Sequence, residues 1–351
     1  MRLQLFPLFL LCVAAAPPLT IAQTPPTEAT LYRAHGLDGQ WDPSGTNRIA
    51  YSAKGPDGWY DVHLALPDGS QDTCLTCAYP GLPTKHVATP CWHPNGQWLL
   101  VAVEKQEHPG NSFPALPGFG AFTDIWLISV NGHKAYKLVE PPLDKHHGII
   151  MPRFSPDGTK IEWTAREKKP NILSLKRTFG YWAITLANLH FTGPDSVPEL
   201  RNMRALRPEG ASFYEGYGFS PDGSRILLCT SAGQRSVWDQ RIATMDTTGT
   251  DLQRLTEKDY NEHAFYTPDG RHIAWMTNTG NKHGTDWWMM DSNGNNKHRL
   301  TAFNDKSSPQ YAGEKVWCGM GSFNPAGDAF VGGRQVSLVS QEGQIMMVRV
   351  R

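Results

Sequence analysis

The stretch Phe154-Ser-Pro-Asp-Gly158 is one of six copies of an aromatic-x-Pro-x-Gly motif in this 351-residue chain. Proline presets φ at the second position of a tight turn, Asp or Asn caps the turn through its side chain, and glycine takes the left-handed position. Each copy therefore predicts a hairpin that joins two strands. The other five copies are Trp41-Asp-Pro-Ser-Gly45, Trp92-His-Pro-Asn-Gly96, Phe219-Ser-Pro-Asp-Gly223, Tyr266-Thr-Pro-Asp-Gly270 and Phe323-Asn-Pro-Ala-Gly327.

The copies lie roughly fifty to sixty-five residues apart, which is the spacing of propeller blades. In most units a further strand ending in a glycine turn follows, as in 124–132 and 286–294, and then a short segment such as Arg254-Leu-Thr256. Four strands per unit is the content of one blade. The sequence therefore predicts an all-β fold, a six-bladed β-propeller with four-stranded antiparallel blades.

With these motifs the chain resembles the TolB-like family of WD-type propeller repeats, whose units carry aromatic-Ser-Pro-Asp-Gly and end in a Leu-Thr strand. The resemblance runs from about Leu31 to the end of the chain and implies the fold rather than a function. TolB itself carries an additional amino-terminal domain, for which this chain has no room, so we do not expect it to share TolB's translocation partnership. Two ways of closing the ring remain open: an outer strand supplied by the last unit itself at 345–350, or one supplied by 29–33.

Residues 1–22 combine one positive charge at Arg2, an apolar run and the small-residue stretch Thr20-Ile21-Ala22. This pattern is typical of a signal peptide and is too short for a transmembrane helix. We expect residues 23–351 to form a single propeller domain that is secreted or periplasmic, with no membrane span. Acidic and basic residues balance at 33 each, and no basic stripe is present, so a nucleic-acid partner is not expected.

Five cysteines remain outside the leader, an odd number, so at least one thiol stays unpaired. Two pairings are open, a local Cys74–Cys77 disulfide and a Cys77–Cys91 disulfide between neighbouring strands. The other two cysteines are Cys229 and Cys318.

In a four-stranded blade the Pro-Asp-Gly turns lie on one face, and the segments that lead into the first strands lie on the opposite face. Those lead-in segments carry histidine in four of six cases and glutamate in two: they are 35–38, 85–89, 145–148, 213–216, 261–263 and 315–318.

Imidazole is a common metal ligand, and three protein ligands leave a position open for chemistry. We therefore expect His86, His147 and His263 to hold a divalent metal, with Glu215 or Glu262 as fourth ligand or general base. The alternative is that these histidines bridge backbone groups around a water-filled channel.

The stretch Glu262-His263-Ala-Phe-Tyr-Thr-Pro-Asp-Gly270 is similar to the part of oligogalacturonate lyases in which a histidine before the turn binds a divalent ion. This resemblance implies that His263 is a metal ligand, although the sequence has no glutamine that matches the further ligand of that family. The catalytic candidates are accordingly Glu215, Glu262 and His263.

Substrate-binding candidates lie around the same mouth. They are His35, Tyr214, Tyr217, Arg235 and Trp317, of which the aromatic residues would stack on a sugar ring and the arginine would bind a carboxylate. The sequence has no Gly-x-Ser-x-Gly elbow, phosphate loop or dinucleotide fingerprint, which disfavours serine-hydrolase and nucleotide chemistry. Two functions remain. The first is metal-assisted lyase or hydrolase chemistry on a polar small molecule such as an acidic oligosaccharide or glycoside, and the second is a non-catalytic scaffold for a protein partner.

Overall fold

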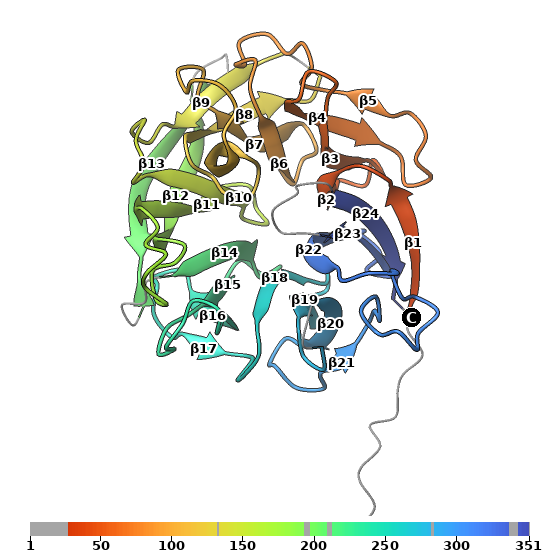
Figure 1. Cartoon of the computed structure of the whole chain (residues 1–351). Coiled ribbons are helices and arrows are strands. Elements are labelled where there is room, and N and C mark those ends of the chain that lie inside the picture. Colours follow the sequence, from red (N-terminus) through yellow and green to blue (C-terminus); the bar gives the residue numbers. More distant parts are fainter. Residues whose placement is uncertain are drawn as a thin grey trace, which may run out of the picture.

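The computed structural model describes residues 27–131, 133–192, 197–208, 213–281, 284–336 and 343–350. In this part of the chain, six four-stranded antiparallel sheets follow one another around a ring (Figure 1). The predicted six-bladed propeller is therefore confirmed. The predicted signal peptide, residues 1–22, lies outside the described residues, and none of the helices in the described part is long and apolar enough to span a bilayer.

Each blade contributes its first strand to the wall of the central channel (Figure 1). These innermost strands are β2 (Leu37–Trp41), β6 (Val87–Trp92), β10 (Gly148–Phe154), β14 (Tyr214–Phe219), β18 (Asn261–Tyr266) and β22 (Trp317–Phe323). The second strands are β3 (Ile49–Lys54), β7 (Trp98–Glu104), β11 (Lys160–Lys168), β15 (Arg225–Thr230), β19 (His272–Thr277) and β23 (Ala329–Gln335). The third strands are β4 (Tyr60–Ala65), β8 (Thr123–Ser129), β12 (Tyr181–Thr192), β16 (Arg241–Asp246), β20 (Asp286–Asp291) and β24 (Gly343–Arg349). The outermost strands are β5 (Thr73–Cys74), β9 (Ala135–Val139), β13 (Val197–Leu206), β17 (Gln253–Arg254), β21 (His298–Arg299) and β1 (Glu28–Arg33).

The strand β1 settles how the ring closes. It pairs antiparallel with β24, with Ala29 opposite Val348, and the two lie side by side in Figure 1. The last blade therefore receives its outermost strand from the start of the propeller, and 345–349 forms its third strand. Of the two alternatives left open by the sequence, the amino-terminal strand is the one observed.

The aromatic-x-Pro-x-Gly motifs form the expected turns between first and second strands. In the third blade the Gly158 N–H donates to the Ser155 carbonyl at 2.9 Å, and Gly158 has φ 72°. The Asp157 carboxylate accepts hydrogen bonds from the Thr159 N–H at 3.0 Å and from the Ser155 hydroxyl at 2.5 Å. Proline, aspartate and glycine thus do what the turn chemistry predicts.

The innermost strands share an irregularity that the motif did not reveal. All six show a register shift against their second strand. In four of them the third residue before the motif's aromatic has positive φ, namely Asp38 (55°), Thr89 (52°), Met151 (54°) and His263 (50°). Such bulges re-aim a side chain, and positive φ at a non-glycine residue costs roughly 1–3 kcal/mol. Backbone strain therefore recurs at the same position of four innermost strands in the channel wall.

Large aromatic side chains fill the wedges between blades, and Trp163, Trp275 and Trp287 are almost completely buried. One disulfide joins Cys74 to Cys77, which is the local one of the two predicted pairings. The remaining cysteines of the described chain, Cys91, Cys229 and Cys318, are free and buried.

Candidate functional site

A cluster of acidic groups lies in the channel wall between the fourth and fifth blades. Glu215 on β14 stands directly opposite Cys229 on β15, and Glu262 comes from β18. One carboxylate oxygen of each glutamate and the Cys229 sulfur lie within 4.8 Å of one another. The Tyr217 hydroxyl completes the group, because it lies 3.3 Å from Glu215 Oε2 and 3.0 Å from Cys229 Sγ. All four side chains are buried.

Burial changes the titration of this cluster. It raises the pKa of Glu262 to about 7, partly offset by a hydrogen bond with Tyr260. Burial, and then the neighbouring charge of Glu262, raise the pKa of Glu215 well above its usual range. The pKa of the Cys229 thiol is raised by the same causes. Two carboxyls with elevated pKa values beside a thiol can exchange protons near neutral pH, or can give those protons up to a bound cation.

A second feature of the channel is a buried arginine without an ion pair. Arg153, on β10, is 6 % exposed and donates to the Pro152 carbonyl at 3.0 Å and to the Met151 sulfur at 3.5 Å. Among the described residues no carboxylate lies within 4.0 Å of its guanidinium. Its charge nevertheless lowers the pKa values of Glu162 and Asp38 against the larger effect of burial, so it lies among the channel's acidic groups.

Glu162, on β11, is fully buried. Its carboxylate oxygens make no hydrogen bond of regular geometry within the described chain, and the Gly218 N–H is the one backbone donor that lowers its pKa. Burial raises its pKa to about 8. The carboxyl occupies space that Gly216 on β14 leaves open, since a Cβ at Gly216 would lie 2.2 Å from Glu162 Oε2. An unsatisfied buried acid costs stability, so its retention points to a role in the channel.

His263 borders the acidic cluster. Its ring lies 6.1 Å from the Tyr217 ring, centroid to centroid, and its Nδ1 is buried without a hydrogen-bond partner. Burial lowers its pKa to about 4, so the imidazole is neutral near pH 7. A neutral imidazole with an unused nitrogen is able to accept a proton or to bind a metal.

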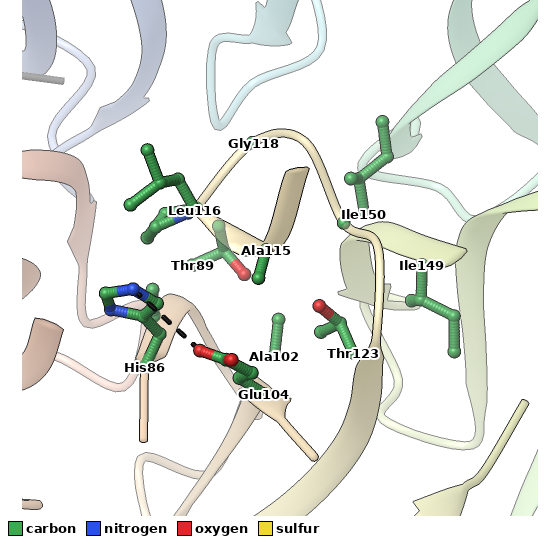
Figure 2. A pocket seen from close by; sticks show the side chains of 13 residues that line it. His86, Thr89, Ala102, Glu104, Ala115, Leu116, Gly118, Thr123, Ile149 and Ile150 are labelled. Atoms are coloured by element: carbon green, nitrogen blue, oxygen red, sulfur yellow. Dashed lines mark ion pairs between the residues drawn. The ribbon is translucent and has the colours of Figure 1, made fainter. Parts of the chain in front are cut away.

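A second cluster lies at the lead-in to the second blade, around a cavity of about 20 Å³. Figure 2 shows the His86 imidazole and the Glu104 carboxylate facing each other there, with Nε2 and Oε2 3.8 Å apart. The Tyr60 N–H donates to His86 Nδ1 at 3.1 Å, so the ring proton is on Nε2. The lowered pKa of His86, about 4 because of burial, agrees with a neutral ring. Both nitrogens are therefore committed, and His86 has no free lone pair for a metal.

The structure does not bring the three predicted histidine ligands together. Within the described residues, the groups of three metal-ligating side chains are Glu215–Cys229–Glu262 and His63–Cys74–Cys77, and the second contains the disulfide. His147 Nδ1 instead lies 2.9 Å from both oxygens of Asp144, within its own lead-in segment. Of the three, only His263 lies beside the acidic cluster.

The predicted substrate-binding residues are also dispersed. Tyr217 belongs to the acidic cluster, whereas Tyr214 is fully buried in the apolar core of the fourth blade. His35 and Arg235 are exposed loop residues. Trp317 is half-buried, packing edge-on against Tyr260 at 6.2 Å, with the Lys315 ammonium 4.7 Å from its ring centre.

Sequence reasoning missed Arg153, Glu162 and Cys229. A signal was present for Arg153, which is the one charged residue of an otherwise apolar strand, and a weaker one for Glu162, which lies between the apolar residues Ile161 and Trp163. Charged residues are seldom fully buried unless they have a partner or a function.

Comparison with solved structures places the fold among known propellers. TolB from Acinetobacter baumannii aligns with a TM-score of 0.54 at 17 % identity, over 88 % of this chain and 65 % of the TolB chain. Oligogalacturonate lyase from Vibrio parahaemolyticus aligns with a TM-score of 0.51 at 12 % identity, over 93 % of this chain and 92 % of the lyase. An oligogalacturonate lyase in complex with manganese aligns with a TM-score of 0.50 at 11 % identity, over 93 % of each chain.

At these identities the likeness shows the fold alone, and this chain spans slightly less than two thirds of the length of the A. baumannii TolB chain. No protein-family profile and no curated protein matches the sequence. The resemblance to TolB-like propellers, and the weaker one to oligogalacturonate lyase, are confirmed at the level of the fold.

Proposed function

We propose that the channel binds an acidic polar small molecule, such as an acidic oligosaccharide or glycoside, and acts on it by metal-assisted lyase or hydrolase chemistry. The observation that carries this proposal is the meeting of Glu215, Cys229 and Glu262 within 4.8 Å in a buried wall. Two carboxylates and a thiol have no structural reason to be gathered there without a cation or a proton to share.

The residues present fit a divalent ion. Carboxylate oxygens suit manganese, and a thiolate with carboxylates also suits zinc. The Tyr217 hydroxyl would orient Glu215 and Cys229 as a supporting hydrogen-bond donor. A bound ion would polarise a substrate carboxylate or a water molecule.

The remaining channel groups have roles that follow from their charge. The guanidinium of Arg153 has unused donors and no carboxylate partner within 4.0 Å among the described residues, so it is suited to hold a substrate carboxylate. Neutral His263, which is not one of the three proposed ligands, is able to accept a proton.

The test is elemental analysis of the purified chain after chelation and incubation with Mn²⁺ or Zn²⁺. We expect the wild type to retain about one ion per chain and the variant E215Q/E262Q to retain none, because amide side chains do not replace anionic ligands. The matched control is D222N/D269N, which removes two carboxylates from the turn face. A wild type that binds no ion, or a Glu variant that binds as the control does, would overturn the metal site.

Substrate turnover is then measured on a panel of acidic oligosaccharides. A lyase gives unsaturated products that absorb in the ultraviolet, whereas a hydrolase gives new reducing ends without this absorbance. We expect R153A to raise KM at least tenfold on acidic substrates, the loss of one charge-assisted contact. An unchanged KM in R153A would show that the arginine does not bind the substrate.

A second candidate function is a scaffold for a protein partner. The loop between β11 and β12, on the mouth side of the ring, exposes three aliphatic side chains: Ile172 is 84 % exposed, Leu173 93 % and Leu175 66 %. Adjacent exposed aliphatic residues are typical of interaction surfaces. If a partner co-purifies with the chain, I172S/L173S should release it, while E215Q/E262Q should not.

We also infer export, on the basis of the leader-like residues 1–22. Expression with the intact amino terminus should yield a processed chain that begins at Gln23. Recovery of full-length protein in the cytoplasm alone would contradict this.

A further inference from the structure

The loop that joins β7 to β8 contains a hydrogen-bonded series of three side chains that the metal site does not use. Glu104 ends β7, and His108 follows four residues later, with its Nδ1 2.5 Å from Glu104 Oε1. On the other side of the imidazole, His108 Nε2 lies 3.4 Å from the Ser112 hydroxyl. Carboxylate, imidazole and hydroxyl therefore stand in the order in which a serine nucleophile, its base and the orienting acid are arranged.

The hydrogen-bond partners of His108 decide which of its ring nitrogens carries the proton. A carboxylate only accepts, so Nδ1 of His108 carries the ring proton and donates it to Glu104. The lone pair is then on Nε2, facing the Ser112 hydroxyl. A separation of 3.4 Å is long for a hydrogen bond, but such contacts are often looser in a site without substrate.

The imidazole is held in place from several sides. It stacks on the Phe122 ring at 4.1 Å between centroids and 11° between planes. The Lys85 ammonium donates to the His108 carbonyl at 2.8 Å and to the Gly110 carbonyl at 2.9 Å. It also lies 4.0 Å from Glu104 Oε1, which places a positive charge beside the carboxylate. His108 and Glu104 are 7 % and 1 % exposed, so the base is preorganised rather than mobile.

Ser112 is not occupied by a structural task. It precedes the short helix η1 (Phe113–Ala115), but its side chain makes no capping hydrogen bond. Its carbonyl accepts from the Ala115 N–H at 2.9 Å, which fixes the turn and leaves the hydroxyl free to face His108. By contrast, the motif serines Ser155 and Ser220 give their hydroxyls to turn carboxylates at 2.5 Å.

The surroundings supply a hydrogen-bond donor. Asn111, next to the serine, turns its Oδ1 toward His86 Nε2 at 3.4 Å, so its amide NH₂ is left to stabilise an oxyanion. The cavity beside Glu104, lined by Ala115 and Leu116, is about 20 Å³ (Figure 2), which is room for one water molecule. Ser112 and His108 do not line it, and an ester reaches the partly exposed Ser112 from the loop surface.

We propose that Ser112, His108 and Glu104 form a second active site that hydrolyses carboxylic esters. The Ser112 oxygen attacks the ester carbonyl carbon while its proton passes to His108 Nε2. The tetrahedral intermediate collapses by breaking the carbon–alkoxy bond, and the alcohol leaves with the proton from His108. Water, activated by the same imidazole, then releases the acid and restores the serine, so that ester and water give acid and alcohol. No Gly-x-Ser-x-Gly elbow is needed, because the same constellation occurs on unrelated folds.

The first experiment labels the full chain with a fluorophosphonate probe and locates the modified peptide by mass spectrometry. We expect the label on Ser112, at least 100-fold less labelling in S112A and H108Q, and unchanged labelling in S174A. Ser174 is the matched control, since it lies in another mouth-side loop and no histidine is within hydrogen-bond distance of its hydroxyl among the described contacts. Absence of labelling above the level of heat-denatured wild type, or labelling that persists in S112A, overturns the proposal.

The second experiment measures release of p-nitrophenol from its acetate ester. We expect hydrolysis of this ester, and loss of the activity in S112A but not in the metal-site variant E215Q/E262Q. Ester hydrolysis is therefore expected even if the channel proves to bind no metal ion. If S112A or H108Q does not fold, the variant S112C provides a separate test. The thiol that S112C places beside His108 should react with iodoacetamide at least tenfold faster than the same thiol in the double variant S112C/H108Q, which has no imidazole there. Equal rates in these two variants overturn the proposal.

Discussion

The turns on one face of the ring and the walls of the central channel both carry carboxyl groups, and their pKa values move in opposite directions. Hydrogen bonds from Ser155 and from the Thr159 N–H lower the pKa of Asp157 to about 2, and the Ser220 and Ser224 hydroxyls act likewise on Asp222. In the channel, burial raises the pKa of Glu162 to about 8.

The difference lies in how fully each carboxyl is hydrogen-bonded. Asp222 accepts bonds of 2.5 Å from Ser220, and of 3.0 Å and 2.8 Å from the N–H and hydroxyl of Ser224. Among the described residues Glu162 accepts no hydrogen bond of regular geometry, and the Gly218 N–H offsets only a small part of the effect of burial. A turn carboxylate contributes to the fold, whereas an unsatisfied channel carboxyl weakens it and is suited to wait for a ligand. The two regions should therefore respond differently to pH and to substitution.

The largest expected effect is on stability at alkaline pH. In the folded, metal-free protein Glu162 keeps its proton up to about pH 8, whereas in the unfolded chain it loses it near 4.5. The folded state therefore binds more protons between these values, and its stability falls as pH rises toward 8. E162Q mimics the protonated acid and should raise the free energy of unfolding at pH 8 by on the order of 4 kcal/mol.

The measurement is denaturant unfolding between pH 6.5 and 8.5 in the presence of a chelator. His263 has a folded pKa near 4 and lowers stability only as pH falls below about 6.5, so it does not contribute in this window. Glu215 and Glu262 also have raised pKa values, so the effect of Glu162 is taken from the difference between wild type and E162Q at each pH. The control D222N should keep the wild-type slope. If the free energy of unfolding of the wild type is constant between pH 6.5 and 8.5, the proposed contrast between turn and channel carboxyls is wrong.

Sequence reasoning could predict the blades because each turn motif is local. Proline, aspartate and glycine act within five residues, so Phe154–Gly158 predicts its hairpin without knowledge of the rest. Ring closure could not be predicted, because the pairing of β1 with β24 joins segments more than three hundred residues apart, such as Ala29 and Val348. The Cys74–Cys77 disulfide, one of the two pairings that the sequence left open, is local too.

The site was harder to predict because it depends on bulges in the innermost strands. A bulge decides which side chain faces the channel, and nothing in the sequence marks the positive φ of His263 or Thr89. The lead-in histidines were reasonable candidates, but His86 is committed to the Tyr60 N–H and His147 to Asp144. Glu215, Glu262 and His263 were predicted as parts of the lead-in segments, and the structure places all three within the innermost strands β14 and β18.

A smaller effect is expected at Gly216, which lies in β14 against the buried Glu162 carboxyl. A Cβ there would lie 2.2 Å from Glu162 Oε2, so G216A should destabilise the fold by roughly 1–3 kcal/mol. The additional variant E162A should abolish most of this cost, and a double-mutant cycle measures the coupling. Gly319 is the matched control on another innermost strand, since its Cβ would meet nothing closer than 3.6 Å. Equal costs for G216A and G319A would argue against contact between Gly216 and the buried acid.

The smallest effect is expected on the turn face. D222A removes the acceptor for Ser220 and Ser224 and should cost about 1 kcal/mol, the usual value for such a hydrogen bond. D222N keeps an oxygen acceptor and should cost less. Because the lowered pKa of Asp222 makes the folded state bind fewer protons than the unfolded one, its contribution is lost as pH falls through the acid range. The loss of unfolding free energy in D222A should therefore be smaller in urea unfolding at pH 3 than at pH 7, whereas the benefit of E162Q appears only as pH rises. If D222A costs the same at pH 3 and at pH 7, the carboxylate charge of Asp222 contributes nothing to the turn.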